Sequence, residues 1–123
     1  MNPEITKFSM RARAKSFKYA FAGIKHFVNS QHNARVHLLA TVLLFVLAVF
    51  FRVSRSEVIA LTFAAGFVWV SELFNTAIEK IMDFISLEIR PEIKRIKDLS
   101  AAAVLLAAIT ALIIGCIVFI PKI

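Results

Sequence analysis

The sequence predicts an all-α membrane protein, with one amphipathic helix on the membrane surface followed by three transmembrane helices. Of the 123 residues, 59% are hydrophobic, and the mean hydropathy is +0.78. Ordinary soluble domains have a lower apolar fraction. The apolar residues also lie in three separate blocks, with most basic residues before and between them. A chain of this length has room for one domain, so we expect residues 1–123 to form a single membrane-embedded domain.

Residues 7–28 are expected to form the surface helix. Basic residues recur along one stripe of this segment, namely Lys7, Arg11, Lys15, Lys18 and Lys25. An apolar stripe lies beside it, made of Phe17, Phe21, Ile24 and Val28. Such a helix places its rings among acyl chains and its cations among anionic headgroups. A polar stretch, residues 29–37, is expected to connect this helix to the first span.

Three apolar blocks are candidates for crossing a bilayer. The first, residues 36–51, is slightly shorter than the roughly 20 residues that a transmembrane helix needs. The second, residues 58–84, is long enough to cross and protrude, and the third, residues 99–120, has no charged residue. Small residues recur every four positions in the third block and predict close packing against another helix. They are Ala103, Ala107, Ala111 and Gly115.

The basic residues predict which side of the membrane each segment faces. Seven of the 15 lysines and arginines precede the first span, and five lie at or beyond the end of the second span and before the third. By the positive-inside rule these segments face the cytoplasm, with the N-terminus inside and residues 52–57 outside. Topology therefore accounts for the net charge of +7. Nucleic-acid binding is disfavoured, because no soluble basic surface is predicted.

A polar stripe lies in the second half of the second span. It consists of Glu72, Asn75, Glu79 and Asp83. At about 100° per residue these side chains point within roughly 80° of one another. Such a stripe is costly near lipid unless a cation or a protic group meets it. The acids either pair with nearby lysines and arginines, or they belong to a phosphotransferase site with a divalent cation and a general base.

Lys97 and Asp98 open the third span in this interpretation. Asp98 suits the N-cap of that span, because an anion is favoured at the positive end of a helix. Lys97 would be a cation at the same end, and a bound phosphate would relieve that unfavourable placement. The three glycines are scattered, so no glycine-rich phosphate loop is present.

Two motifs resemble a known family, the bacterial integral-membrane diacylglycerol kinase and undecaprenol kinase family. They read ELFNTAIEKIMD, beginning at Glu72, and KDLSAAAVLLAAI, beginning at Lys97. The resemblance extends over nearly the whole chain from FKYAFAGIKH onward. It implies an ATP-dependent, Mg²⁺-requiring lipid kinase of the bacterial inner membrane that works as a homotrimer. Its active sites would lie between subunits at the cytoplasmic surface, and its acceptor would be diacylglycerol or undecaprenol.

The resemblance also implies roles for individual residues. Glu72 matches the catalytic base, and Asn75 matches a polar partner that contacts the substrate. Glu79 matches a carboxylate that binds the metal bridging the ATP phosphates. Four further positions match residues that contact the nucleotide: Tyr19, Glu88, Lys97 and Asp98. Gln31 stands where the family pattern has a second acidic metal ligand, and a neutral amide attracts Mg²⁺ more weakly than a carboxylate does.

Two other functions remain open at this point. Gln31 favours a catalytically weakened relative that acts as a non-enzymatic membrane scaffold or regulator. A channel lined by the acidic stripe is disfavoured, because the polar residues are confined to one end of the span. Between the two acceptors, the RVH element at residues 35–37 and the short chain lean toward undecaprenol, by resemblance alone.

Overall fold

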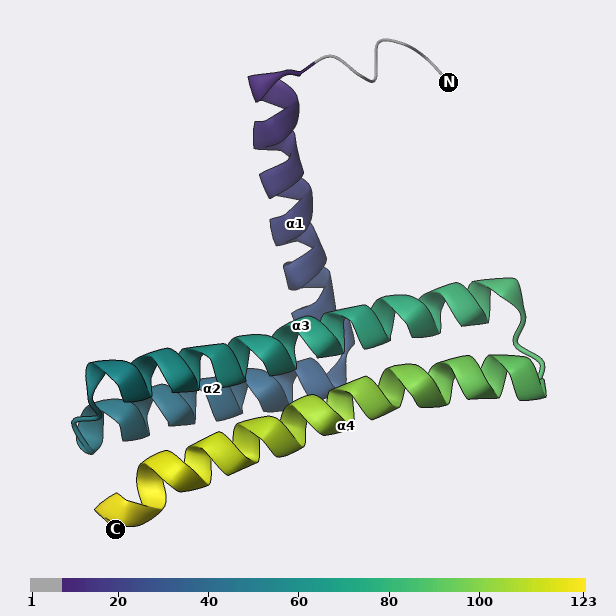
Figure 1. Ribbon diagram of the computed structural model, residues 1–123. Helices are drawn as coiled ribbons and strands as arrows, with labels where there is room; N and C mark the ends of the chain where they lie inside the picture. The colour runs from purple at the N-terminus through teal and green to yellow at the C-terminus, as the bar shows by residue number, and fades with distance from the viewer. Residues whose placement is uncertain (1–7) are drawn as a thin grey trace. The chain divides into compact units, whose positions relative to one another are not determined.

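The computed structural model describes residues 8–123, which form α-helices and one short 3₁₀-helix (Figure 1). The elements are α1 (Met10–Ser30), α2 (His32–Phe50), α3 (Arg55–Ile85), α4 (Pro91–Phe119) and the 3₁₀-helix η2 (Ile120–Lys122). No β-strand occurs among the described residues, so the predicted all-α class is confirmed there. Helices α2, α3 and α4 with η2 are long and apolar enough to cross a membrane, as the three apolar blocks predict. The chain divides into two compact units at Leu38 and Leu39.

In the first unit, α1 is capped at both ends by groups close to it in sequence. The Ser9 hydroxyl accepts a hydrogen bond from the backbone N–H of Ala12 at 3.3 Å and so caps the N-terminus. At the other end, the guanidinium of Arg35 donates to the carbonyls of Val28 and Asn29, at 3.4 and 2.8 Å. These bonds satisfy carbonyls that have no partner within the helix, and a cation suits the negative helix end. Lys7, the first residue of the predicted surface helix, lies outside the described residues.

The predicted polar connector, residues 29–37, is helical except at one residue. Gln31 adopts an extended conformation between α1 and α2, and its N–H donates to the carbonyl of Phe27 at 3.0 Å. The carbonyl of Gln31 accepts from the N–H of Ala34 at 3.2 Å, which begins the next helix. Polarity led the sequence analysis to expect a loop here. The capping by Arg35 instead allows one helix to end and another to begin within a single residue.

In the second unit, α3 and α4 pack side by side in antiparallel directions, joined by the turn at residues 86–90 (Figure 1). Four residues of α3 are buried, at three- or four-residue intervals: Leu61, Ala64, Val68 and Glu72. On α4 the buried residues are Ser100, Ala107 and Val118. Ala107 confirms part of the predicted small-residue face, whereas Ala103 is exposed. A strict four-residue spacing rotates around the helix by about 40° per step, so it cannot stay on one buried face.

Helix α4 begins eight residues before the predicted start of the third span. Pro91 is its first residue, and Arg90 before it is extended, with φ −117° and ψ 141°. Proline suits the first helical position because it needs no N–H partner, and it restricts the residue before it to extended conformations. Arg90 is accordingly not part of the helix. The same proline also starts the helix, so the loop between α3 and α4 spans only residues 86–90.

At the opposite end of this unit, the start of α3 is tied to the end of the chain. Ser54 and Glu57 form a capping box, with bonds of 3.2 Å from the Glu57 N–H to the Ser54 hydroxyl and 2.8 Å from the Ser54 N–H to the Glu57 carboxylate. Lys122 of η2 lies 3.1 Å from the same carboxylate. Helix α2 is joined to α3 by a hydrogen bond of 2.8 Å from the Trp69 indole N–H to the Thr41 hydroxyl.

The two turns of the second unit allow a direct test of the predicted topology. In a Cys116→Ala background, we expect Ser56→Cys, in the first turn of α3 beside residues 51–54 that join α2 to α3, to react with a membrane-impermeant maleimide on intact spheroplasts. Leu87→Cys, at a position that is 85% exposed in the other turn, should react only after the membrane is opened. The physical reason is the excess of basic residues on the segments predicted to face the cytoplasm. The reverse labelling pattern would contradict the orientation.

Candidate functional site

The polar stripe predicted from the sequence lies on α3 and passes from a buried to an exposed position. Glu72 is buried, with 7% of its surface exposed, and Asn75, one turn later, is half-buried. Glu79 and Asp83 are exposed near the end of the helix. A carboxylate at the depth of Glu72 is costly in an apolar helix pair unless polar groups surround it. The stripe therefore has its buried acid, Glu72, partway along α3 and its exposed acids at the end of α3 that leads into the turn.

Asn75 connects α3 to α4 through a residue that the sequence analysis did not select. Its side-chain NH₂ donates to the hydroxyl of Ser100 at 2.7 Å. Ser100 is buried, with 8% exposed, and its hydroxyl donates to the backbone carbonyl of Lys97 at 3.0 Å. The available signal was a polar residue among alanines and leucines, three positions after Lys97 and therefore on the same helical face.

Lys97 does not lie at a helix N-terminus, so the electrostatic argument made for it from the sequence is wrong. It lies in the second turn of α4, because that helix begins at Pro91. Its ammonium is 2.6 Å from the carboxylate of Asp83, at the exposed end of the stripe. The two side chains are 36% and 50% exposed, which makes the pair a weak one. The exposed end of the stripe thus has a cationic partner on the neighbouring helix.

Asp98 is likewise inside α4 and is not its N-cap, which is Arg90. Its carboxylate accepts from the ammonium of Lys94, one turn earlier, at 2.5 Å. Both side chains are more than 60% exposed. Asp98 and Lys97 are consecutive residues, so they point about 100° apart around the helix and contact different partners.

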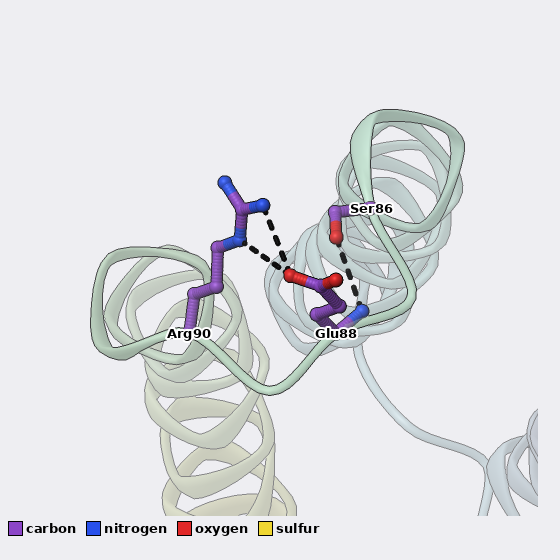
Figure 2. Close-up of polar contacts among 3 residues, drawn as sticks. All are labelled: Ser86, Glu88 and Arg90. Atoms are coloured by element: carbon purple, nitrogen blue, oxygen red, sulfur yellow. Dashed lines mark hydrogen bonds and ion pairs between the residues drawn. The ribbon is translucent and has the colours of Figure 1, made fainter.

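Glu88 lies in the turn between α3 and α4 (Figure 2). One of its carboxylate oxygens accepts from the Nε and Nη2 of Arg90, at 3.2 and 3.0 Å. Its backbone N–H donates to the hydroxyl of Ser86 at 3.1 Å. The Glu88 side chain is 74% exposed, so the acid remains accessible from water at the end of the helix pair.

The two remaining predicted residues, Tyr19 and Gln31, belong to the first unit. Tyr19 is on α1 and is 67% exposed, and Gln31 is half-buried between α1 and α2. Three of the predicted residues are therefore connected by hydrogen bonds. Asn75 is bonded to Ser100, Ser100 is bonded to the backbone of Lys97, and the side chain of Lys97 is bonded to Asp83. Within residues 8–123, no cluster of three or more His, Cys, Asp and Glu side chains could hold a metal ion.

A small apolar recess lies beside the Asn75–Ser100 bond, with a volume of about 300 Å³. Besides those two polar residues, its lining consists mainly of apolar side chains of α3 and α4: Phe67, Val70, Phe74, Ile78 and Ala103. A pocket with an apolar body and a few polar groups at one side suits an amphipathic ligand. The arrangement is a polar site that borders directly on an apolar surface.

Comparison with known proteins identifies the family to which this site belongs. The profile of prokaryotic diacylglycerol kinases matches residues 18–119, which is most of the chain. The chain belongs to the prokaryotic diacylglycerol kinase family. The matched residues include the whole of α2, α3 and α4 and both motifs quoted above. The family resemblance stated from the sequence is thereby confirmed.

Two curated members of the prokaryotic diacylglycerol kinase family are similar to this chain. A diacylglycerol kinase of Synechocystis sp. is 36% identical over 107 residues, which are 86% of this chain and 61% of that protein. An undecaprenol kinase of Bacillus subtilis is 32% identical over 108 residues, which are 88% of both chains. This chain thus spans about three-fifths of the Synechocystis relative. Both names are those of lipid kinases, in agreement with the predicted class of enzyme.

The Asn75–Ser100 bond predicts a measurable contribution to stability. We expect Asn75→Ala to lower the free energy of unfolding by about 0.5–2 kcal/mol, because interhelical hydrogen bonds in membranes contribute about this much. Thermal unfolding in detergent micelles measures the effect. Ser71→Ala is the matched control, since that hydroxyl donates only to Val68 of its own helix, at 2.9 Å. Equal effects of the two substitutions would contradict a role for Asn75 in joining the helices.

Proposed function

We propose that this protein is a lipid kinase that transfers the γ-phosphate of ATP to the hydroxyl of a membrane lipid alcohol. One observation carries the proposal. In a member of this family, a buried carboxylate and an amide lie one turn apart on one face of α3, the amide lines an apolar recess, and the same face leads to a lysine of α4. Phosphoryl transfer requires mainly that charged groups be positioned and neutralised. A lipid acceptor further requires that the site border on an apolar surface.

Glu72 is the proposed general base. Its burial supports this role, because a carboxylate buried within the helix pair can meet a hydroxyl inside the membrane boundary. Asn75, one turn away, would contact the substrate beside it. The recess next to Asn75 would then hold an apolar part of the acceptor.

The nucleotide is proposed to bind at the exposed end of the stripe, through Lys97, Asp98, Glu88 and Tyr19. Lys97 can contact a phosphate because its ion pair with Asp83 is half-exposed and contributes roughly 0–1 kcal/mol. An ammonium also has three N–H donors, so it can keep Asp83 while it binds phosphate. Glu88 and Tyr19 are exposed enough to meet a ligand that arrives from water.

Magnesium is proposed to bind through Glu79 and Gln31. Carboxylate and amide oxygens are the donor types that Mg²⁺ prefers, and bound Mg²⁺ neutralises charge on the transferring phosphates. The Glu79 side chain is exposed and has no ion-pair partner among residues 8–123, so it remains available for a cation. With one carboxylate rather than two, this donor set attracts a cation less strongly.

The protein is further proposed to act at the cytoplasmic face of a bacterial inner membrane, as a homotrimer that shares its sites between subunits. Large apolar side chains on the spans are exposed in the single chain, among them Phe63, Phe74 and Leu99 at 75%, 66% and 68%. In a membrane these side chains face lipid or another copy of the chain. The names of the two relatives leave both diacylglycerol and undecaprenol as acceptors.

Removing the proposed base should abolish the reaction. We expect Glu72→Gln to lower kcat at least about 100-fold, because general-base catalysis contributes on this order. The measurement is transfer of radiolabel from γ-labelled ATP into lipid, in mixed micelles that offer diacylglycerol or undecaprenol separately. Glu57→Gln is the matched control, since glutamine also serves in a capping box and Glu57 lies at the other end of α3. Full activity of Glu72→Gln would overturn the role of Glu72.

The metal proposal predicts a change in magnesium dependence. Gln31→Glu should lower the Mg²⁺ concentration that gives half-maximal activity several-fold, because a carboxylate attracts the cation more strongly than an amide. Asn33→Asp, two residues away, controls for added negative charge and should leave the dependence unchanged. If wild-type protein neither transfers phosphate nor gains thermal stability with Mg–ATP, the non-enzymatic scaffold becomes the better explanation.

A further inference from the structure

The Asn75–Ser100–Lys97 chain of hydrogen bonds has a direction. The Ser100 hydroxyl carries one proton, and it donates that proton to the Lys97 carbonyl at 3.0 Å. The same oxygen can therefore only accept from Asn75, at 2.7 Å. It follows that the NH₂ of Asn75 faces Ser100, and its carbonyl oxygen Oδ1 remains as the group that can contact a ligand.

We propose that Ser100 is a positioning residue that makes Asn75 a hydrogen-bond acceptor toward the ligand. The inference rests on the proposed kinase function. An amide held in this orientation recognises an O–H donor and would repel a phosphate oxygen. Two sources of that donor are available in the proposed reaction: a hydroxyl of the lipid alcohol and a water molecule bound to magnesium. Nothing in the family motifs quoted above assigns a role to Ser100.

Burial makes the orientation stable. Turning the amide over would bring Oδ1 against the Ser100 oxygen, and the hydroxyl would have to release the Lys97 carbonyl to donate to it. Ser100 is 92% buried, so water cannot readily replace the lost bond. Among residues 8–123, Oδ1 of Asn75 has no other hydrogen-bond partner that would favour the opposite orientation.

The same hydroxyl also links the lipid and phosphate ends of the proposed site. Ser100 is bonded to the backbone of Lys97, and the side chain of Lys97 is bonded to Asp83 on α3. Asn75 and Asp83 are two turns apart on α3, and Ser100 and Lys97 are one turn apart on α4. These four residues thus hold two points of α3 against one turn of α4, so a change at Ser100 acts on Asn75 directly and on Lys97 only through its backbone.

The experiment compares Ser100→Ala with Ser100→Thr in the full-length protein in mixed micelles. The chain has four asparagines, so selective ¹⁵N labelling of asparagine side chains gives a simple spectrum in which Asn75→Gln assigns the resonance. We expect the NH₂ signals of Asn75 to move in Ser100→Ala and to be retained in Ser100→Thr, which keeps a hydroxyl. Thr110→Ala is the control, because its hydroxyl donates only to Leu106 of α4. Unchanged Asn75 signals in Ser100→Ala would overturn the proposal.

Kinetics separate the sources of the O–H donor. Loss of one oriented neutral hydrogen bond is expected to weaken binding about fivefold. If the lipid hydroxyl is the partner, Ser100→Ala raises KM for the lipid alcohol and leaves KM for ATP unchanged. If metal-bound water is the partner, the half-saturating Mg²⁺ concentration rises instead. A rise in KM for ATP alone would mean that Asn75 donates to phosphate, and it would overturn the proposal. Inactive wild-type protein would refute the kinase function but not the spectroscopic result.

Discussion

The packing of α3 against α4 is the constraint on which the candidate site depends. Both helices are apolar along most of their length, yet α3 carries a buried carboxylate and a half-buried amide. Polar groups at such positions are tolerated only where a neighbouring helix supplies partners. The Asn75–Ser100 bond supplies one for the amide, and nearer the loop the Asp83–Lys97 ion pair joins the same two helices. The helix pair and the polar site are therefore one structural feature.

The site changes in polarity along the helix pair, and this change matches the chemistry proposed for it. At one end, Glu72 is buried, and Asn75, one turn away, lines an apolar recess. At the exposed end, Lys97, Asp83 and Glu88 are accessible from water. A reaction that joins a lipid hydroxyl to a phosphate from a water-soluble nucleotide needs both surroundings within a short distance. Two antiparallel helices that end together at a short turn provide them with few residues.

The exposed ion pairs contribute little to stability and are better understood as arrangements of charge. Lys97–Asp83, Lys94–Asp98 and Arg90–Glu88 are all at least one-third exposed, where such pairs contribute roughly 0–1 kcal/mol. The three pairs place three acids and three cations near one end of the helix pair, and none of these side chains is held tightly. A phosphate or a metal ion can therefore exchange partners with these side chains at small cost.

Hydrophobic blocks, charge distribution and the motif from Glu72 to Asp83 determined the all-α class, the three long apolar helices and the family from sequence alone, because each depends on local composition or spacing. Helix ends were less well predicted, since they depend on capping. Arg35 caps the end of α1 in a stretch that was expected to be a loop, and α4 begins at Pro91, before the expected start of the third span. Which acid pairs with Lys97, and that Ser100 holds Asn75, only the tertiary structure decided. Those contacts join residues 14 and 25 positions apart, and their geometry is set by how two helices pack, which no local pattern records.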